Sequence, residues 1–152
     1  MVKRLDENAG AALPDHVGWR LWQASRAWQA EFAEAMRRAG HVWFSESRAG
    51  LLGHIPRRGL RQGALIDRAG ISKQAVQQLL DGLEAEGVIE RAADPDDKRG
   101  KLVRYTERGL AALGDADRIK LDIERGYRER LGEAGFDALM TALRLLAAAP
   151  RD

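Results

Sequence analysis

Residues 70–87 read GISKQAVQQLLDGLEAEG, and this segment has the end signals and the apolar spacing of a helix. Ser72 is a favourable N-cap, and Gly87 suits the left-handed residue that often closes a helix. Between them, apolar residues recur at the i, i+3, i+4, i+7 spacing of one helix face. They are Val76, Leu79, Leu80 and Leu83. The spacing predicts a helix that buries this face against the preceding helix.

The opposite face of this helix changes from basic and amide-bearing to acidic along its length. A short helix, a tight turn and a second helix with a polar start are typical of a helix-turn-helix, whose second helix enters the DNA major groove. Glutamine can pair with adenine, lysine can donate to guanine or phosphate, and helix N-terminal N–H groups can bind phosphate. We therefore expect DNA contacts from Ser72, Lys73, Gln74, Gln77 and Gln78.

The next two segments, VIERAA at 88–93 and KLVRYT at 101–106, carry β-branched and aromatic residues on either side of the turn-rich DPDDKRG. This pattern predicts a β-hairpin with a charged tip. A basic hairpin tip beside a helix-turn-helix is a wing, and we expect Asp97 to brace Arg99 for insertion into the minor groove. A plain solvated hairpin loop is the alternative. The predicted wing contacts are Asp97, Lys98, Arg99 and Lys101.

The regions outside this centre predict further helices. Apolar residues alternate at steps of four and three from Val17 to Ala35, which indicates a long first helix between Pro14 and Arg38. A helix starting at Ser45 and another at 60–69 follow. Beyond Thr106, a plausible N-cap, apolar spacing marks one helix to Leu131 and another from Phe136 to Ala147.

These elements predict a mainly α fold with a two- or three-stranded β wing. We expect one domain over residues 1–152, with a winged helix-turn-helix at about 45–106 between helices at about 14–40 and 107–149. A monomer would leave apolar faces of the terminal helices exposed, so dimerisation through the two ends is expected. A self-contained helical bundle is the alternative.

Composition and charge restrict the class of protein. The chain is 45% hydrophobic and 32% charged, with a net charge of +2, which is typical of a folded globular protein. It has no cysteine, so disulfides and thiolate metal sites are excluded. Residues 57–80 and 98–108 each carry five bases and one acid, whereas 81–97 carries seven acids and one base. Neither an apolar membrane span nor a signal peptide is evident, so we expect a cytoplasmic protein.

Catalysis and metal binding have little support. Ser45, Ser47 and Ser72 suit helix starts, and no nucleophile elbow or phosphate-cradling glycine loop is present. We therefore expect neither an enzyme nor a cofactor. The histidines, at 16, 41 and 54, have no i, i+4 pairing. A metal-responsive regulator remains an alternative.

The aromatic residues near the first helix suggest a ligand pocket. Trp19, Trp22 and Trp43, with Phe44 nearby, can line a pocket for a flat aromatic ligand at the junction of the first two helices. Arg26, Arg48 or His41 would meet its carboxylate. The alternative is that these tryptophans are core or interface residues.

Residues 71–109 resemble the core of the MarR family of bacterial winged-helix transcriptional regulators. The resemblance includes the D-x-R of the wing (Asp97–Arg99) and the T-E-x-G that follows it (Thr106–Gly109). It implies a homodimeric repressor that binds a pseudo-palindromic operator in double-stranded DNA and often releases it when a small aromatic acid binds. Gln78 departs from the family, because many members carry arginine there. A winged-helix module that instead binds proteins through its acidic segment, 81–97, is the alternative.

Overall fold

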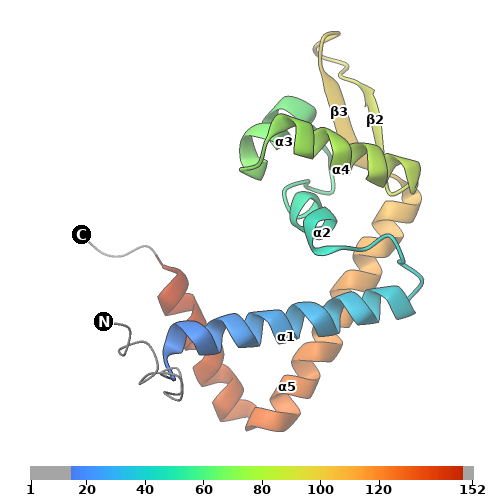
Figure 1. The fold of residues 1–152 in the computed structure, drawn as a ribbon. Helices are drawn as coiled ribbons and strands as arrows, with labels where there is room; N and C mark the ends of the chain where they lie inside the picture. Colours follow the sequence, from blue (N-terminus) through green and yellow to red (C-terminus); the bar gives the residue numbers. More distant parts are fainter. Residues whose placement is uncertain (1–14, 149–152) are drawn as a thin grey trace, which may run out of the picture.

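The computed structural model describes residues 15–148, so the outermost residues of the predicted terminal helices, 14 and 149, lie outside the described part. Figure 1 shows a winged-helix module at one end and two long helices crossing at the other. The elements are α1 (Val17–Arg38), α2 (Glu46–Leu52), β1 (Leu60–Arg61), α3 (Gln62–Ala69), α4 (Lys73–Ala85), β2 (Ile89–Ala93), β3 (Lys101–Tyr105) and α5 (Glu107–Ala147). The predicted fold class is confirmed. No helix in this described range is both long and apolar enough to cross a membrane.

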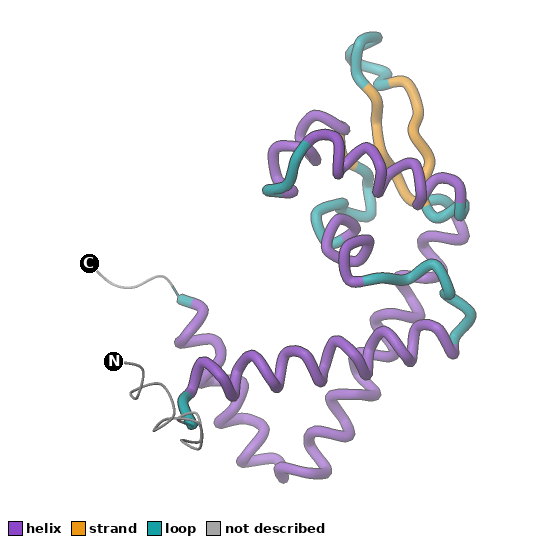
Figure 2. Tube along the Cα trace, in the orientation of Figure 1, coloured by secondary structure: helices purple, strands orange, loops and turns teal. Residues whose placement is uncertain are grey.

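The strands form one antiparallel sheet in the order β1-β3-β2. The predicted hairpin is confirmed, with Ile89 opposite Tyr105 and Ala93 opposite Lys101. Figure 2 shows the hairpin extending beyond the helices that surround its base. The expectation of a helix from residue 60 is wrong at its start, because Leu60 and Arg61 pair with β3. A two-residue strand is too short to show a period in the sequence.

Side-chain caps mark where α1, α2, α4 and α5 begin, and His16 caps α1. Ser45, Ser72 and Thr106 each accept a hydrogen bond from the backbone N–H three residues later, as N-cap residues do. Gly87, at φ +69°, lies just past the end of α4, in the left-handed region that glycine adopts without steric cost. The predicted limits of α4 are therefore confirmed.

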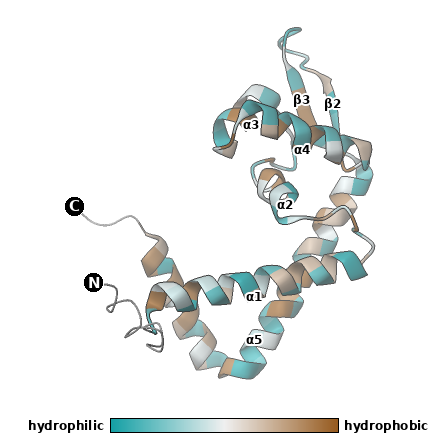
Figure 3. Ribbon diagram, in the orientation of Figure 1, coloured by the Kyte–Doolittle hydropathy of each residue, from teal (hydrophilic) through white to brown (hydrophobic). Residues whose placement is uncertain are grey.

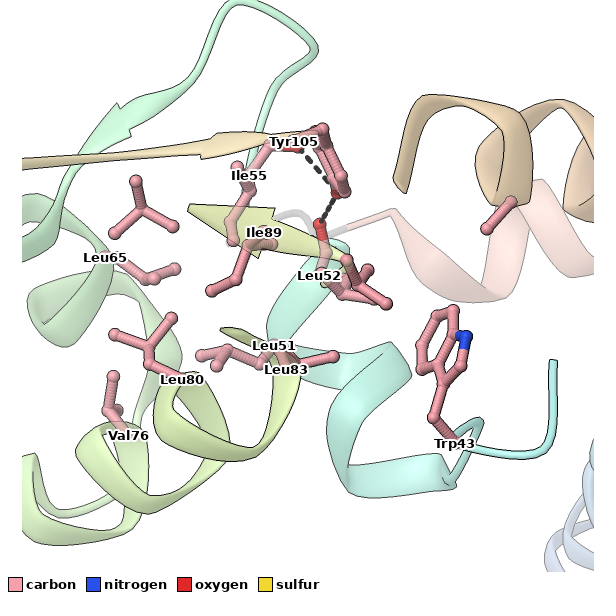
Figure 4. Close-up of a cluster of buried hydrophobic side chains, with 13 residues drawn as sticks. Trp43, Leu51, Leu52, Ile55, Leu65, Val76, Leu80, Leu83, Ile89 and Tyr105 are labelled. Atoms are coloured by element: carbon pink, nitrogen blue, oxygen red, sulfur yellow. Dashed lines mark hydrogen bonds between the residues drawn. The ribbon is translucent and has the colours of Figure 1, made fainter. Parts of the chain in front are cut away.

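The hydrophobic core has two parts. The larger part lies inside the winged helix, where Leu65, Val76, Leu80, Leu83, Val88 and Val103 are fully buried. Figure 4 shows Tyr105 within this cluster, where its hydroxyl donates to the backbone oxygens of Leu52 and Ile55. The smaller part joins α1 to α5 through Phe32, Met36, Ala116, Ile119 and Ile123.

α5 is two helical segments joined at Gly132. This residue has φ 71° and ψ 161°, which are not helical angles. The second segment therefore turns back toward the start of α1 (Figure 1). The predicted division between Leu131 and Phe136 is confirmed.

Candidate nucleic-acid interface

The start of α4 presents the polar side chains predicted to contact DNA. Its apolar face is buried against the winged-helix core, whereas Ser72, Lys73, Gln74 and Gln78 are exposed. The Ser72 hydroxyl accepts from the backbone N–H of Ala75 at 3.1 Å, so it caps the helix. The structure thus brings these residues together on one surface, and Gln77 beside them is half-buried.

Gln77 is held by a residue that the sequence reasoning missed. Arg91, on β2, donates through Nη1 to Gln77 Oε1 at 3.2 Å. Its Nη2 donates to Asp81 Oδ1 and to Glu84 Oε2, each at 2.6 Å. The hydrogen bond from Arg91 lowers the pKa of Glu84 from its ordinary value, and burial opposes this shift. The sequence does contain a signal for this role of Arg91. It is the one base in the segment 81–97, which also carries seven acids.

The wing tip is ordered by two aspartates. Asp97 Oδ1 accepts from the backbone N–H of Arg99 at 3.0 Å. Asp97 therefore braces the backbone of the turn. This contact differs from the prediction, which was that Asp97 holds the side chain of Arg99. Asp94, which is 4% exposed, accepts from the backbone N–H of Asp96 at 2.9 Å.

The wing is also tied to β1. Asp94 Oδ2 lies 2.5 Å from Nε of Arg61, an ion pair without hydrogen-bond geometry. Lys98, Arg99 and Lys101 are all exposed. None of these three side chains forms an ion pair with any residue of the described range 15–148. The charges at the tip are therefore available to a phosphate backbone or a DNA groove.

A cavity of about 600 Å³ lies between α1, α2 and α5, next to the winged-helix core. Among the predicted ligand residues, Trp43 and Arg26 line it, together with Phe44. Its lining also includes Trp28, Gln29, Phe32, Met36, Tyr105 and Lys120, which the sequence reasoning did not assign to a ligand site. The side-chain atoms Gln29 Oε1 and Trp43 Nε1 are buried without a hydrogen-bond partner among the described residues.

The other predicted ligand residues lie elsewhere. Trp19 and Trp22 stack on each other near the start of α1, with ring centroids 4.9 Å apart, and both are exposed. Arg48 Nη1 donates to the backbone oxygen of Trp43 at 2.9 Å, and His41 Nε2 lies 2.8 Å from Asp115 Oδ2. The structure therefore does not bring all the predicted ligand residues together. Within residues 15–148, no group of three or more histidines and acids is placed to hold a metal ion.

Comparison with known proteins supports the family resemblance. A MarR family model matches residues 44–100. The transcriptional regulator HosA of Escherichia coli O111:H- is 30% identical over 86 residues, which are 57% of this chain and 64% of HosA. The chain thus matches less than two thirds of that relative's length.

The solved structures that share the fold include CouR and PcaV. CouR, described as a transcriptional repressor bound to a 23-mer DNA duplex, is 24% identical with a TM-score of 0.68, and the match covers 91% of this chain and 100% of CouR. PcaV of Streptomyces coelicolor, solved with its natural ligand, is 18% identical with a TM-score of 0.63, over 90% of this chain and 96% of PcaV. The chain is therefore similar to the MarR family over residues 44–100 and shares the fold of the solved MarR structure.

Proposed function

We propose that this protein is a sequence-specific, double-stranded DNA-binding transcriptional regulator, acting as a homodimeric repressor on a pseudo-palindromic operator. The observation that carries the proposal is the position of two polar surfaces at the same end of the molecule (Figure 1). One is the exposed start of α4, with Lys73 and Gln74, and the other is the basic wing tip, with Lys98 and Arg99. Such an arrangement suits a helix in the major groove and a wing in the adjacent minor groove.

The acidic segment, 81–97, gives less support to a protein-docking role. Asp81 and Glu84 pair with Arg91. Two further acids of the segment, Glu90 and Asp94, pair with Arg104 and Arg61. Much of its charge is therefore neutralised within the fold, which favours DNA over a basic protein as the partner.

The homodimer is supported by exposed apolar residues at the far end of the molecule. At the start of α1 they include Val17, which is 69% exposed, and Leu21. At the end of α5 they include Leu145, which is 73% exposed, and Leu146. Figure 3 shows hydrophobic colouring in both regions. Apolar patches of this kind mark interaction surfaces, and a two-fold dimer would place two α4 helices on successive major grooves, about 34 Å apart.

A small aromatic carboxylate is the proposed effector. The cavity between α1, α2 and α5 has aromatic walls, and Arg26 is the residue of the predicted set that offers it a positive charge. Arg26 Nη1 lies 3.6 Å from Glu46 Oε2 and is exposed, so a ligand carboxylate can compete for it. The shared fold with ligand-bound PcaV supports a binding site for small molecules.

The test is selection of binding sites from random duplex DNA, followed by a salt series on the selected site. A DNA regulator yields a two-fold repeat, and its affinity falls steeply with salt because phosphate contacts release counterions. Arg99→Ala is expected to weaken binding to all sequences and to lower the salt slope by about 1 for each wing, which is about 2 for the homodimer. Arg125→Ala is the matched control, because this exposed arginine lies on α5, away from the wing, and pairs with Asp122. Failure to enrich any sequence, or equal salt slopes for the two variants, would contradict the proposal.

A further inference from the structure

Arg91 determines which way the amide of Gln77 faces. A guanidinium group has donors and no acceptor, so the amide atom next to Arg91 Nη1 must be the oxygen, Oε1, 3.2 Å away. The arginine side chain is only 15% exposed and is held by Asp81 and Glu84 as well. Its position, and therefore the orientation of the Gln77 amide, is fixed by several bonds.

This contact gives Gln77 a different hydrogen-bonding capacity from that of its neighbours. Its oxygen is held against β2, so the Nε2 group, with two donors, is the part directed away from Arg91. Gln74 and Gln78 are exposed and form no side-chain hydrogen bond within residues 15–148. Their amides can therefore turn to present either atom.

The polarity of an amide determines the base it prefers. Adenine presents an acceptor and a donor in the major groove, and a free glutamine pairs with both, whereas the guanine edge presents two acceptors, N7 and O6. A side chain that offers only donors matches guanine. Gln77 also lies one helical turn after Lys73 on α4, so the two share one face of the helix.

We propose that Arg91 is a positioning residue that makes Gln77 a donor to guanine in the major groove. This inference rests on the proposed DNA-binding function. Arg91 itself contacts no base and acts through the Gln77 oxygen. It also forms ion pairs with Asp81 and Glu84, whose unpaired carboxylates would repel the phosphate backbone from the same helix. Removing Arg91 therefore has two separable effects, a general loss of affinity and a change of preference at one base pair.

The experiment compares site selection by the wild type, Gln77→Ala, Arg91→Ala and the double variant. The wild type is expected to prefer guanine over adenine at least about fivefold at one position of each half-site, and Gln77→Ala to lose this preference. Arg91→Ala is expected to admit adenine at that position and to keep the other positions. In the Gln77→Ala background, Arg91→Ala is expected to lower affinity without a further change in preference.

Two additional variants separate positioning from charge and folding. Arg104→Ala removes the same charge from the neighbouring strand, where the partner is Glu90, and is expected to keep the guanine preference. Arg91→Lys keeps the charge but lacks the fork that holds Gln77 and two carboxylates together. It is expected to retain most of the affinity while losing the preference, and it decides the question if Arg91→Ala does not fold.

The outcomes distinguish this inference from the function on which it rests. If the wild type enriches no sequence, the DNA-binding proposal fails and this one fails with it. If the wild type enriches a site, the DNA-binding proposal is retained. The inference about Arg91 then fails if Gln77→Ala, or both Arg91 variants, keep the wild-type base preference at every position of that site. Loss of the guanine preference in Arg104→Ala would also overturn the inference, because charge alone would then explain it.

Discussion

Replacing Gly109 with alanine is expected to disrupt the joint between the wing and α5. Gly109 is buried in the first turn of α5, and a Cβ there would lie 1.9 Å from the backbone oxygen of Val88. Tyr105 Cδ1 would lie 3.2 Å away on another side. The Val88 oxygen also accepts hydrogen bonds from the backbone N–H of Thr106 at 3.1 Å and from its hydroxyl at 3.2 Å. It therefore cannot move away without weakening both bonds.

The size of the effect follows from these contacts. The distance to Val88 must lengthen from 1.9 Å to at least 3.0 Å before a Cβ is tolerated. Losing the bond from the Thr106 backbone N–H costs about 1 kcal/mol, whereas the Thr106 hydroxyl keeps its bond to the Gly87 oxygen at 2.5 Å. The strain of overpacking adds about 1–3 kcal/mol. Alanine's higher helix propensity offsets about 1 kcal/mol. We therefore expect Gly109→Ala to lower the free energy of unfolding by about 1–3 kcal/mol.

Urea unfolding followed by tryptophan fluorescence measures this change, with all variants at one protein concentration. Gly114→Ala is the control, because this glycine lies in the same helix and a Cβ there would meet no atom within 4 Å. That variant is expected to be more stable than the wild type by about 0.5–1 kcal/mol. A Gly109→Ala protein as stable as the wild type would refute the reasoning, because the Val88 contact would then impose no cost.

Three further results are expected. Tyr105→Phe should lower the free energy of unfolding by about 1–2 kcal/mol in urea unfolding, because it removes the hydroxyl that donates to two buried carbonyls; no change would show that these bonds contribute nothing. Burial raises the pKa of Tyr105 to about 12, so an absorbance titration of tyrosinate should lose its step near pH 12 in the same variant. The hydrogen bond with His41, and the contribution of Arg118, lower the pKa of Asp115. Since a lowered carboxyl pKa stabilises the fold above the unfolded pKa, this stabilisation is lost as pH falls through the folded pKa. Asp115→Asn should therefore unfold less steeply with acid than the wild type, and identical acid profiles would contradict the role of this pair.

The features that local sequence determines were predictable. Ser72 and Thr106 have the hydroxyl that an N-cap needs, and Gly87 supplies the left-handed residue after α4. The hairpin was also recognisable, because β-branched and aromatic residues flank a turn-rich segment. In each case the signal and the structure it specifies lie within a few residues of each other.

The features that escaped prediction depend on contacts between distant segments. Arg91 reaches Gln77 only because β2 packs beside α4, and Arg61 reaches Asp94 across the sheet. Trp19 and Trp22 are aromatic like the residues of a pocket wall, yet they lie at the start of α1, whereas Trp43 follows the end of that helix. Helical periodicity places residues on a face but does not say which element will cover that face.

The joint at Gly109 also connects the wing to the long helix α5. Thr106, the N-cap of α5, donates to the backbone oxygens of Gly87 and Val88 at the root of the wing and accepts from the backbone N–H of Gly109 in the first turn of α5. Residues 107–131 form a rod of about 37 Å at 1.5 Å per residue. A tilt of about 10° at the Gly132 end carries the other end through about 6 Å, comparable to the width of the minor groove. If residues 107–131 tilt as a rigid rod, a small rotation near Gly132 would displace the wing by about the width of a DNA groove.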